Sequence, residues 1–182
     1  MILTGTEIER EVSRERISIS PFRPEQLNPN SYNYRLARLL RTSSDSRLDA
    51  RGNQDWKTIE IPLEGLVLHP RRVYLGSTVE AFGSVRYVPT LMGRSSLGRL
   101  GMFLQVSADL GNLGTAHCWT LEITVVQKLR IYPEMIVGQV AFWRPMGEMT
   151  MYSGRYHDFS GPTPFLTDVA RQELIDEVPT NS

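Results

Sequence analysis

Short apolar segments separated by glycine and proline follow one another along the middle of this chain, from Ile59 to Trp143. The clearest is residues 119–125, where Trp, Leu, Ile and Val alternate with Thr, Glu and Thr. Because successive side chains of a strand point to opposite faces, this alternation predicts a strand with one apolar and one polar face. Many short strands at close spacing are typical of a β-barrel or a double-sheet roll. The sequence therefore predicts a mainly β domain.

The two ends of the chain differ from this middle part. Thr4 and Glu7 form a capping box, so we expect a short helix that starts there and ends before Ile17. Residues 17–20 alternate in polarity and predict a short strand, whereas the polar residues 41–57 predict an exposed loop. From residue 144 onward Gly, Ser, Pro and Tyr become frequent, with one thin helical pattern at 166–177. We therefore divide the chain into a β-domain with a short N-terminal helix, residues 1–150, and a C-terminal tail, residues 151–182.

The charge balance of the chain limits the kinds of partner that we expect it to bind. With 20 basic and 20 acidic residues its formal net charge is zero, which argues against a general nucleic-acid or membrane surface. A single cysteine, Cys118, excludes an internal disulfide and fits a reducing compartment. We find neither a signal peptide nor an apolar run near the roughly 20 residues of a spanning helix. We expect a cytoplasmic protein.

Two features carry the candidate chemistry. Residues 93–101 read Gly-Arg-Ser-Ser-Leu-Gly-Arg-Leu-Gly, and one helical turn there would place Ser95 and Arg99 on the same face. Such a turn with Arg94 and Arg99 is either a phosphate site or a glycine-bounded turn whose arginines sit in solvent. Glu122, between two threonines on the polar strand face, is either catalytic or an ordinary solvent-facing carboxylate.

Segments spread over most of the chain resemble one enzyme family. The motif at 93–101 is similar to the signature of the dCTP deaminases, relatives of the trimeric dUTPases. Further similarities lie in order at 1–3 (Met-Ile-Leu), 29–36 (Pro-Asn-Ser-Tyr-Asn-Tyr-Arg-Leu), 120–122 (Thr-Leu-Glu), 132–139 (Tyr-Pro-Glu-Met-Ile-Val-Gly-Gln), 154–156 (Gly-Arg-Tyr) and 161–164 (Gly-Pro-Thr-Pro). The resemblance implies a mainly β, dUTPase-like distorted β-barrel or jelly roll with short helices, an N-terminal helix and a C-terminal lid formed by the tail.

The resemblance also implies a role for individual residues. Glu122 would be the general base that activates a water to attack C4 of cytosine and then returns the proton as ammonia leaves. Ser95 and Arg99 would orient that water and the base and stabilise the developing charge. The implied nucleotide-binding residues are Arg94, Ser95, Ser96, Arg99, Asn112, Thr120, Tyr152, Arg155, Tyr156 and Phe159.

The same resemblance implies the partners. It predicts a homotrimer with sites between subunits, dCTP as substrate, dTTP as a candidate inhibitor, and Mg²⁺ that arrives with the triphosphate. A zinc-dependent deaminase would instead need a His or Cys near a Glu, together with a Pro-Cys-x-x-Cys pair. The chain has one cysteine, three histidines and no such pair, so we predict no metal bound by protein ligands.

Several positions depart from the family pattern. Asn112 stands where the family usually has Asp, the residue that activates water for phosphate cleavage in dUTPases and bifunctional deaminases. Leu113 replaces a Pro and His117 a Gly in the same segment, and Phe159 replaces a Gln of the lid, while Arg155 in place of Lys keeps the charge. These changes cluster around the expected base and sugar.

Four functions therefore remain open. The first is a dCTP deaminase that makes dUTP and ammonia. The second is a deaminase of a modified cytosine nucleotide, or a bifunctional deaminase and diphosphatase. The third is a nucleotide-binding regulatory relative without turnover. The fourth, which ignores the resemblance, is a cupin-like β-roll, although the chain lacks the His/Glu metal cluster of that class.

Overall fold

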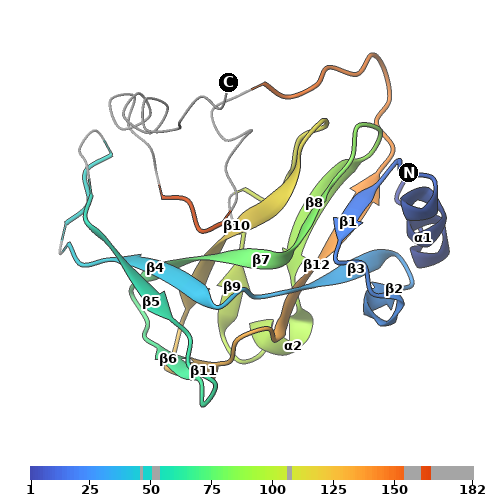
Figure 1. The fold of residues 1–182 in the computed structure, drawn as a ribbon. Coiled ribbons are helices and arrows are strands. Elements are labelled where there is room, and N and C mark those ends of the chain that lie inside the picture. The colour runs from blue at the N-terminus through green and yellow to red at the C-terminus, as the bar shows by residue number, and fades with distance from the viewer. Residues whose placement is uncertain (46, 51–53, 106–107, 154–160, 165–182) are drawn as a thin grey trace, which may run out of the picture.

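Antiparallel strands dominate the structure, a computed structural model that describes residues 1–45, 47–50, 54–105, 108–153 and 161–164 (Figure 1). The larger sheet has the order β5-β4-β7-β10-β9, and β1 pairs with the far end of β7. Its strands are β1 (Ser18–Ser20), β4 (Leu39–Ser43), β5 (Trp56–Glu60), β7 (Val73–Gly83), β9 (Met102–Leu104) and β10 (Ala116–Val125). The two long strands β7 and β10 pair with each other in the middle of this sheet.

A second sheet of order β2-β3-β12-β8 and a two-stranded sheet, β11-β6, complete the fold. Their strands are β2 (Leu27–Asn28), β3 (Ser31–Arg35), β6 (Leu66–Leu68), β8 (Val88–Gly93), β11 (Leu129–Ile131) and β12 (Ile136–Trp143). Strands distant in sequence pair side by side, as β3 does with β12 and β10 with β7. The predicted mainly β fold is confirmed, and its sheets are antiparallel.

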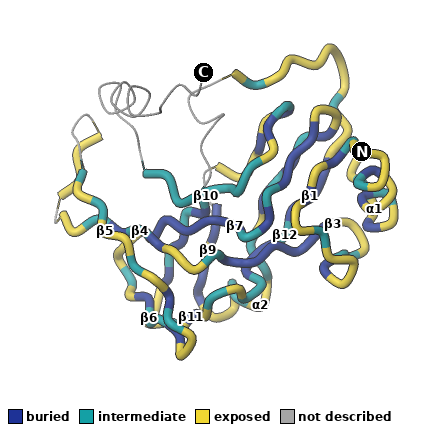
Figure 2. The backbone as a smooth tube through the Cα atoms, in the orientation of Figure 1, coloured by how far each residue is buried: buried dark blue, intermediate teal, exposed yellow. Residues whose placement is uncertain are grey.

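The core lies between the sheets, where the long central strands are buried (Figure 2). The predicted apolar face of β10 is confirmed, since Leu121, Ile123 and Val125 are buried in this core. The intervening Thr120, Glu122 and Thr124 are half-buried on the opposite face. The period-two pattern thus leaves one polar strip along β10.

Within the described residues, three short helical segments accompany the sheets: α1 (Gly5–Ser13), the 3-10 turn η1 (Pro24–Gln26) and α2 (Ser95–Gly98). The side chain of Thr4 accepts a hydrogen bond from the backbone N–H of Glu7 at 3.4 Å, so the predicted N-cap is confirmed. Glu11 on α1 is buried and accepts a hydrogen bond from the Tyr87 hydroxyl at 2.8 Å. This contact fixes α1 to the segment between β7 and β8.

The prediction of an exposed loop over 41–57 was wrong at both ends. Strand β4 continues to Ser43 and β5 begins at Trp56, and the two strands pair antiparallel. The pattern misled because β5 is an edge strand whose Lys57 and Thr58 are exposed, so it lacks an apolar alternation. The predicted helix at 166–177 lies outside the described residues. Within the described part of the chain, no helix is long and apolar enough to cross a membrane.

Candidate active site

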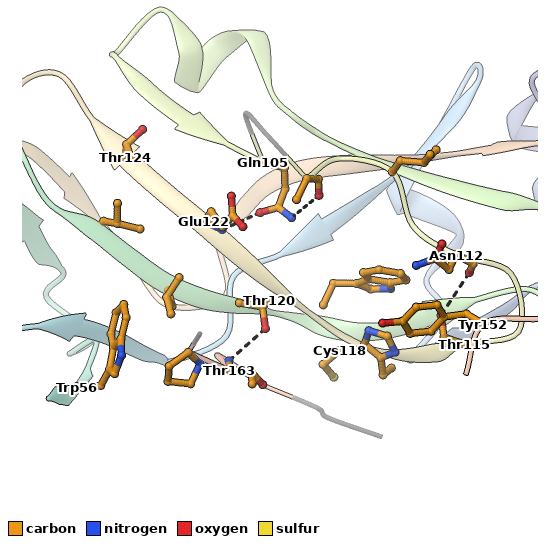
Figure 3. A pocket seen from close by; sticks show the side chains of 17 residues that line it. Trp56, Gln105, Asn112, Thr115, Cys118, Thr120, Glu122, Thr124, Tyr152 and Thr163 are labelled. Carbon is orange, nitrogen blue, oxygen red and sulfur yellow. Dashed lines mark hydrogen bonds between the residues drawn. The ribbon is translucent and has the colours of Figure 1, made fainter. Parts of the chain in front are cut away.

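A cavity of about 650 Å³ lies over the polar strip of β10. Its lining comes from β10, from Val73 and Leu75 on β7, and from segments on either side. Figure 3 shows Trp56 at one end, Asn112, Thr115 and Tyr152 at the other, and Glu122 between them. The cavity is large enough for a nucleotide-sized ligand, which needs roughly 300–1,000 Å³.

Glu122 is the only carboxylate among the described residues that line the cavity. It is half-buried, and its place opposite Leu75 in the β7–β10 ladder sets its side chain on the polar face. Its backbone N–H donates to the side-chain oxygen of Gln105 at 2.7 Å. A single carboxylate in a partly desolvated cavity is suited to accept and return one proton.

Thr120, two residues before Glu122, contacts a segment of the C-terminal tail. Its hydroxyl donates to the backbone oxygen of Gly161 at 2.8 Å and accepts from the backbone N–H of Thr163 at 3.1 Å. Thr163 and Pro164 therefore form part of the cavity wall. The tail segment 161–164 covers the strand that carries Glu122.

The opposite end of the cavity is formed by the turn at residues 112–115 and by Tyr152, which contacts that turn. The backbone N–H of Tyr152 donates to the carbonyl of Leu113 at 2.9 Å, and the hydroxyl of Thr115 donates to the carbonyl of Asn112 at 3.3 Å. Asn112 is exposed, whereas Leu113 and Thr115 are buried. The predicted residues Asn112 and Tyr152 thus lie together at this end.

Aromatic rings form one wall of the cavity. The ring of His117 lies 4.4 Å from that of Trp119, which in turn stacks on Phe82 at 5.9 Å. The indole N–H of Trp119 donates to the carbonyl of Phe82 at 2.8 Å, so the ring is held in place. Such a wall suits a planar base.

The signature residues lie apart from this cavity. As predicted, they form a helical turn: the backbone N–H of Arg99 donates to the carbonyl of Ser95 at 3.0 Å. Ser95, Ser96 and Arg99 are exposed and Arg94 is half-buried, and none of the four lines the cavity. A single chain therefore does not bring the signature and Glu122 together. Arg155, Tyr156 and Phe159 lie outside the described residues.

A sequence model of the family described as dCTP deaminase-like matches residues 2–145. The chain belongs to this family. It is 44% identical over 167 residues to the dCTP deaminase, dUMP-forming, of Hathewaya histolytica, an alignment that covers 91% of this chain and 96% of that relative. It is 42% identical, over 91% of this chain and 95% of the relative, to the protein of the same name from Leptospira biflexa. The predictions of the family and of an enzyme are confirmed.

A solved structure shows the dCTP deaminase-like fold as well. The crystal structure of 2′-deoxycytidine 5′-triphosphate deaminase from Agrobacterium tumefaciens superposes with a TM-score of 0.61 at 18% identity. The superposition covers 78% of this chain, which spans about half (47%) of that longer chain. At this identity the similarity concerns the fold alone.

The family resemblance did not reveal every residue of the cavity. Gln105 lines the cavity next to Glu122. The residues around Gln105 in the sequence form no pattern that predicts this position. Trp56 and Trp119 also line the cavity, although neither is among the site residues that the sequence predicts. Cys118 lies on the same strand, and its thiol donates to the carbonyl of Val79 at 3.7 Å. No group of three or more His, Cys, Asp or Glu side chains in the described chain is placed to hold a metal ion.

Proposed function

We propose that this dCTP deaminase-like protein deaminates dCTP hydrolytically, releasing ammonia and dUTP. The observation that carries the proposal is Glu122, the single described carboxylate in a nucleotide-sized cavity with an aromatic wall. The relatives named dCTP deaminase, at 41–44% identity, support the same reaction class. The chemistry needs one group that takes and returns a proton, and we assign this role to Glu122.

In this mechanism the Glu122 carboxylate accepts a proton from a water, and the resulting hydroxide attacks C4 of the cytosine ring. Glu122 passes this proton to N3, so the C4–N3 double bond becomes a single bond. Glu122 then takes the proton of the new C4 hydroxyl and delivers it to the amino group, and the C4–N bond to that group breaks as ammonia leaves. The carbonyl formed at C4 makes the product a uracil nucleotide, and Glu122 returns to its initial state. No protein-bound metal takes part in these steps.

We infer that Ser95 and Arg99 reach the nucleotide from a neighbouring subunit of a homotrimer. Their exposure, and their separation from the cavity of their own chain, support this arrangement. Arg94 and Arg99 would then provide charge-assisted hydrogen bonds to phosphate oxygens. Mg²⁺ would enter as part of the substrate, held by phosphate oxygens and water, because Mg²⁺ retains water and accepts few protein ligands.

The product is a separate question, and the relatives favour a second candidate function. Their names describe dUMP-forming enzymes, which would also cleave the triphosphate. That cleavage needs a further carboxylate to deprotonate a water, and an amide cannot accept that proton. Asn112 occupies the position where the family usually has this carboxylate, at the Tyr152 end of the cavity. The neighbouring carboxylate Asp109 does not line the cavity. We therefore propose that this protein stops at dUTP.

One incubation separates these candidates. Purified protein is mixed with Mg²⁺ and dCTP, dUTP or a 5-substituted dCTP, and ammonia and pyrophosphate are measured separately. We expect ammonia and accumulating dUTP from dCTP, without pyrophosphate. Pyrophosphate and dUMP would establish the bifunctional alternative, and turnover of the 5-substituted nucleotide alone would establish the modified substrate. Binding without either product would contradict the proposed reaction.

A further inference from the structure

Gln105 is the residue at which the chain leaves the larger sheet. It follows β9 directly, and its backbone N–H donates to the carbonyl of Glu122 at 3.4 Å, one step beyond the last ladder pair. Its φ is 49°, in the left-handed region that a residue with a side chain rarely adopts. Gln105 is nevertheless buried, with 7% of its surface exposed. Contacts around it must hold this conformation.

At the end of the β9–β10 ladder, the side chain of Gln105 accepts a hydrogen bond that a backbone carbonyl would accept in a regular pair. In a regular antiparallel pair, the N–H of Glu122 would donate to the backbone carbonyl of the residue opposite. Here it donates instead to the side-chain oxygen of Gln105 at 2.7 Å (Figure 3). The left-handed turn aims the side chain back at the strand that its own backbone has left.

The amide nitrogen of Gln105 holds a second wall of the cavity. It donates to the carbonyl of Ala108 at 3.1 Å, at the start of the segment that reaches Asn112. This segment is tied to β8 on its other side: the N–H of Leu91 donates to the carbonyl of Asp109 at 2.7 Å, and Gly111 donates to Pro89 at 2.8 Å. Gln105 thus links the strand of Glu122 to the wall that carries Asn112.

We propose that Gln105 is a positioning residue for the reaction, which holds the backbone of Glu122 and the 108–112 wall in register. The inference rests on the proposed function of Glu122. An apolar side chain at position 105 leaves two inward-facing backbone groups, the Glu122 N–H and the Ala108 carbonyl, without their present partner. Glu122 then shifts relative to the bound base, and a displacement of a reacting group slows the chemical step more than it weakens binding.

The test compares Gln105→Met with Gln54→Met. Gln54 also donates from its side-chain amide to a carbonyl, that of Asp49 at 2.6 Å, but it lies outside the cavity lining and the signature. For Gln105→Met we expect kcat for ammonia release from dCTP to fall about 10- to 100-fold with little change in KM. The control variant keeps the wild-type kcat. Equal kcat in the two variants overturns the proposal.

Hydrogen exchange of backbone amides tests the same contact without substrate. We expect the Glu122 amide to exchange about tenfold faster in Gln105→Met, the factor expected for one lost hydrogen bond. The amide of Thr124, which lies opposite Phe103 in the regular ladder, is the internal reference and keeps its rate. An unchanged Glu122 rate overturns the proposal. If wild type releases no ammonia from dCTP, the proposed function fails, while this measurement still decides whether Gln105 holds Glu122.

A second variant guards against a folding defect. Gln105→Glu keeps an oxygen that can accept from the Glu122 N–H, but it has no amide to donate to the Ala108 carbonyl. We expect the Glu122 amide to keep its wild-type exchange rate in this variant, whereas Gln105→Met exchanges it faster. Equal Glu122 exchange rates in the two variants would count against the proposal.

Discussion

Thr120 and Thr163 are joined by a hydrogen bond across 43 residues of sequence: the hydroxyl oxygen of Thr120 accepts from the backbone N–H of Thr163 at 3.1 Å. The same hydroxyl donates to Gly161, so one side chain on β10 fastens the tail segment to the cavity. Thr120, which the family resemblance presented as a nucleotide ligand, thus has a demonstrable contact with the tail. Its contact with a nucleotide stays a prediction.

Replacing Thr120 by Val should release this tail segment. The methyl group keeps the volume of the side chain but removes both hydrogen bonds, each of which contributes about 1 kcal/mol. We expect faster hydrogen exchange of the Thr163 amide and a lower kcat/KM for dCTP. Thr124→Val is the matched control, because Thr124 lies on the same face of β10 and lines the cavity. Equal exchange rates in the two variants would refute the anchoring role.

Glu11 should make the stability of the fold sensitive to acid. Although burial raises the pKa of this carboxyl, hydrogen bonds from Tyr87 and Arg14 and the charges of Arg14 and Arg16 outweigh it and lower the pKa below the ordinary 4.5. A lowered pKa stabilises the fold at pH values above that ordinary value, and the stabilisation is lost as pH falls through the folded-state pKa.

Denaturant unfolding measured between about pH 3 and 7 checks this linkage. Wild type should lose free energy of unfolding as the pH falls through the acidic end of that range. Glu11→Gln should lessen this acid dependence, whereas Glu9→Gln, an exposed position on the same helix, should preserve it. A Glu11→Gln protein with the wild-type acid dependence would show that other carboxylates are responsible.

Asn112→Asp should add a phosphate-cleaving step. The substitution places a second carboxylate at the Tyr152 end of the cavity, where it can deprotonate a water. We expect pyrophosphate and dUMP from dUTP in this variant, with ammonia release from dCTP within about tenfold of wild type. Asp109→Asn, outside the cavity lining, should alter neither product. Pyrophosphate release by the wild-type protein would remove the basis of this prediction.

Two inactive variants should restore activity when they are mixed. If Arg99 reaches the cavity of a neighbouring subunit, trimers assembled from Arg99→Ala and Glu122→Gln chains contain some sites with both native residues. We expect each variant alone to release ammonia at least about 100-fold more slowly than wild type, and a refolded mixture to recover a fraction of the rate. Light scattering should give a mass three times that of the 20.7-kDa chain. An active monomer would contradict the shared site.

Local patterns predicted those parts of the site that depend on local geometry. The alternation of residues 119–125 placed Glu122 on the polar face of its strand, and a four-residue spacing placed Ser95 and Arg99 on one face of a turn. Both follow from the periodicity of a single element. The separation of these two groups within a single chain depends on how the elements pack, which no local period encodes.

The parts that the sequence did not reveal depend on long-range contacts or on an unusual backbone. Trp56 lies on an edge strand without alternation, and it reaches the cavity only because β5 pairs with β4 at the rim of the sheet. Gln105 adopts a left-handed φ that glycine would have signalled and glutamine does not. The contact of Thr120 with the tail likewise joins segments far apart in the chain.

Glu122→Gln tests the central claim most directly. The amide keeps the size of the side chain and leaves the backbone hydrogen bond to Gln105 in place, but it cannot accept a proton from water. Ammonia release from dCTP is measured in single turnover, alongside nucleotide binding by calorimetry. We predict binding within about threefold of wild type and a rate lower by at least about 100-fold, the usual contribution of a general base. Deamination at the wild-type rate would contradict the account, because another group would then have to activate the water.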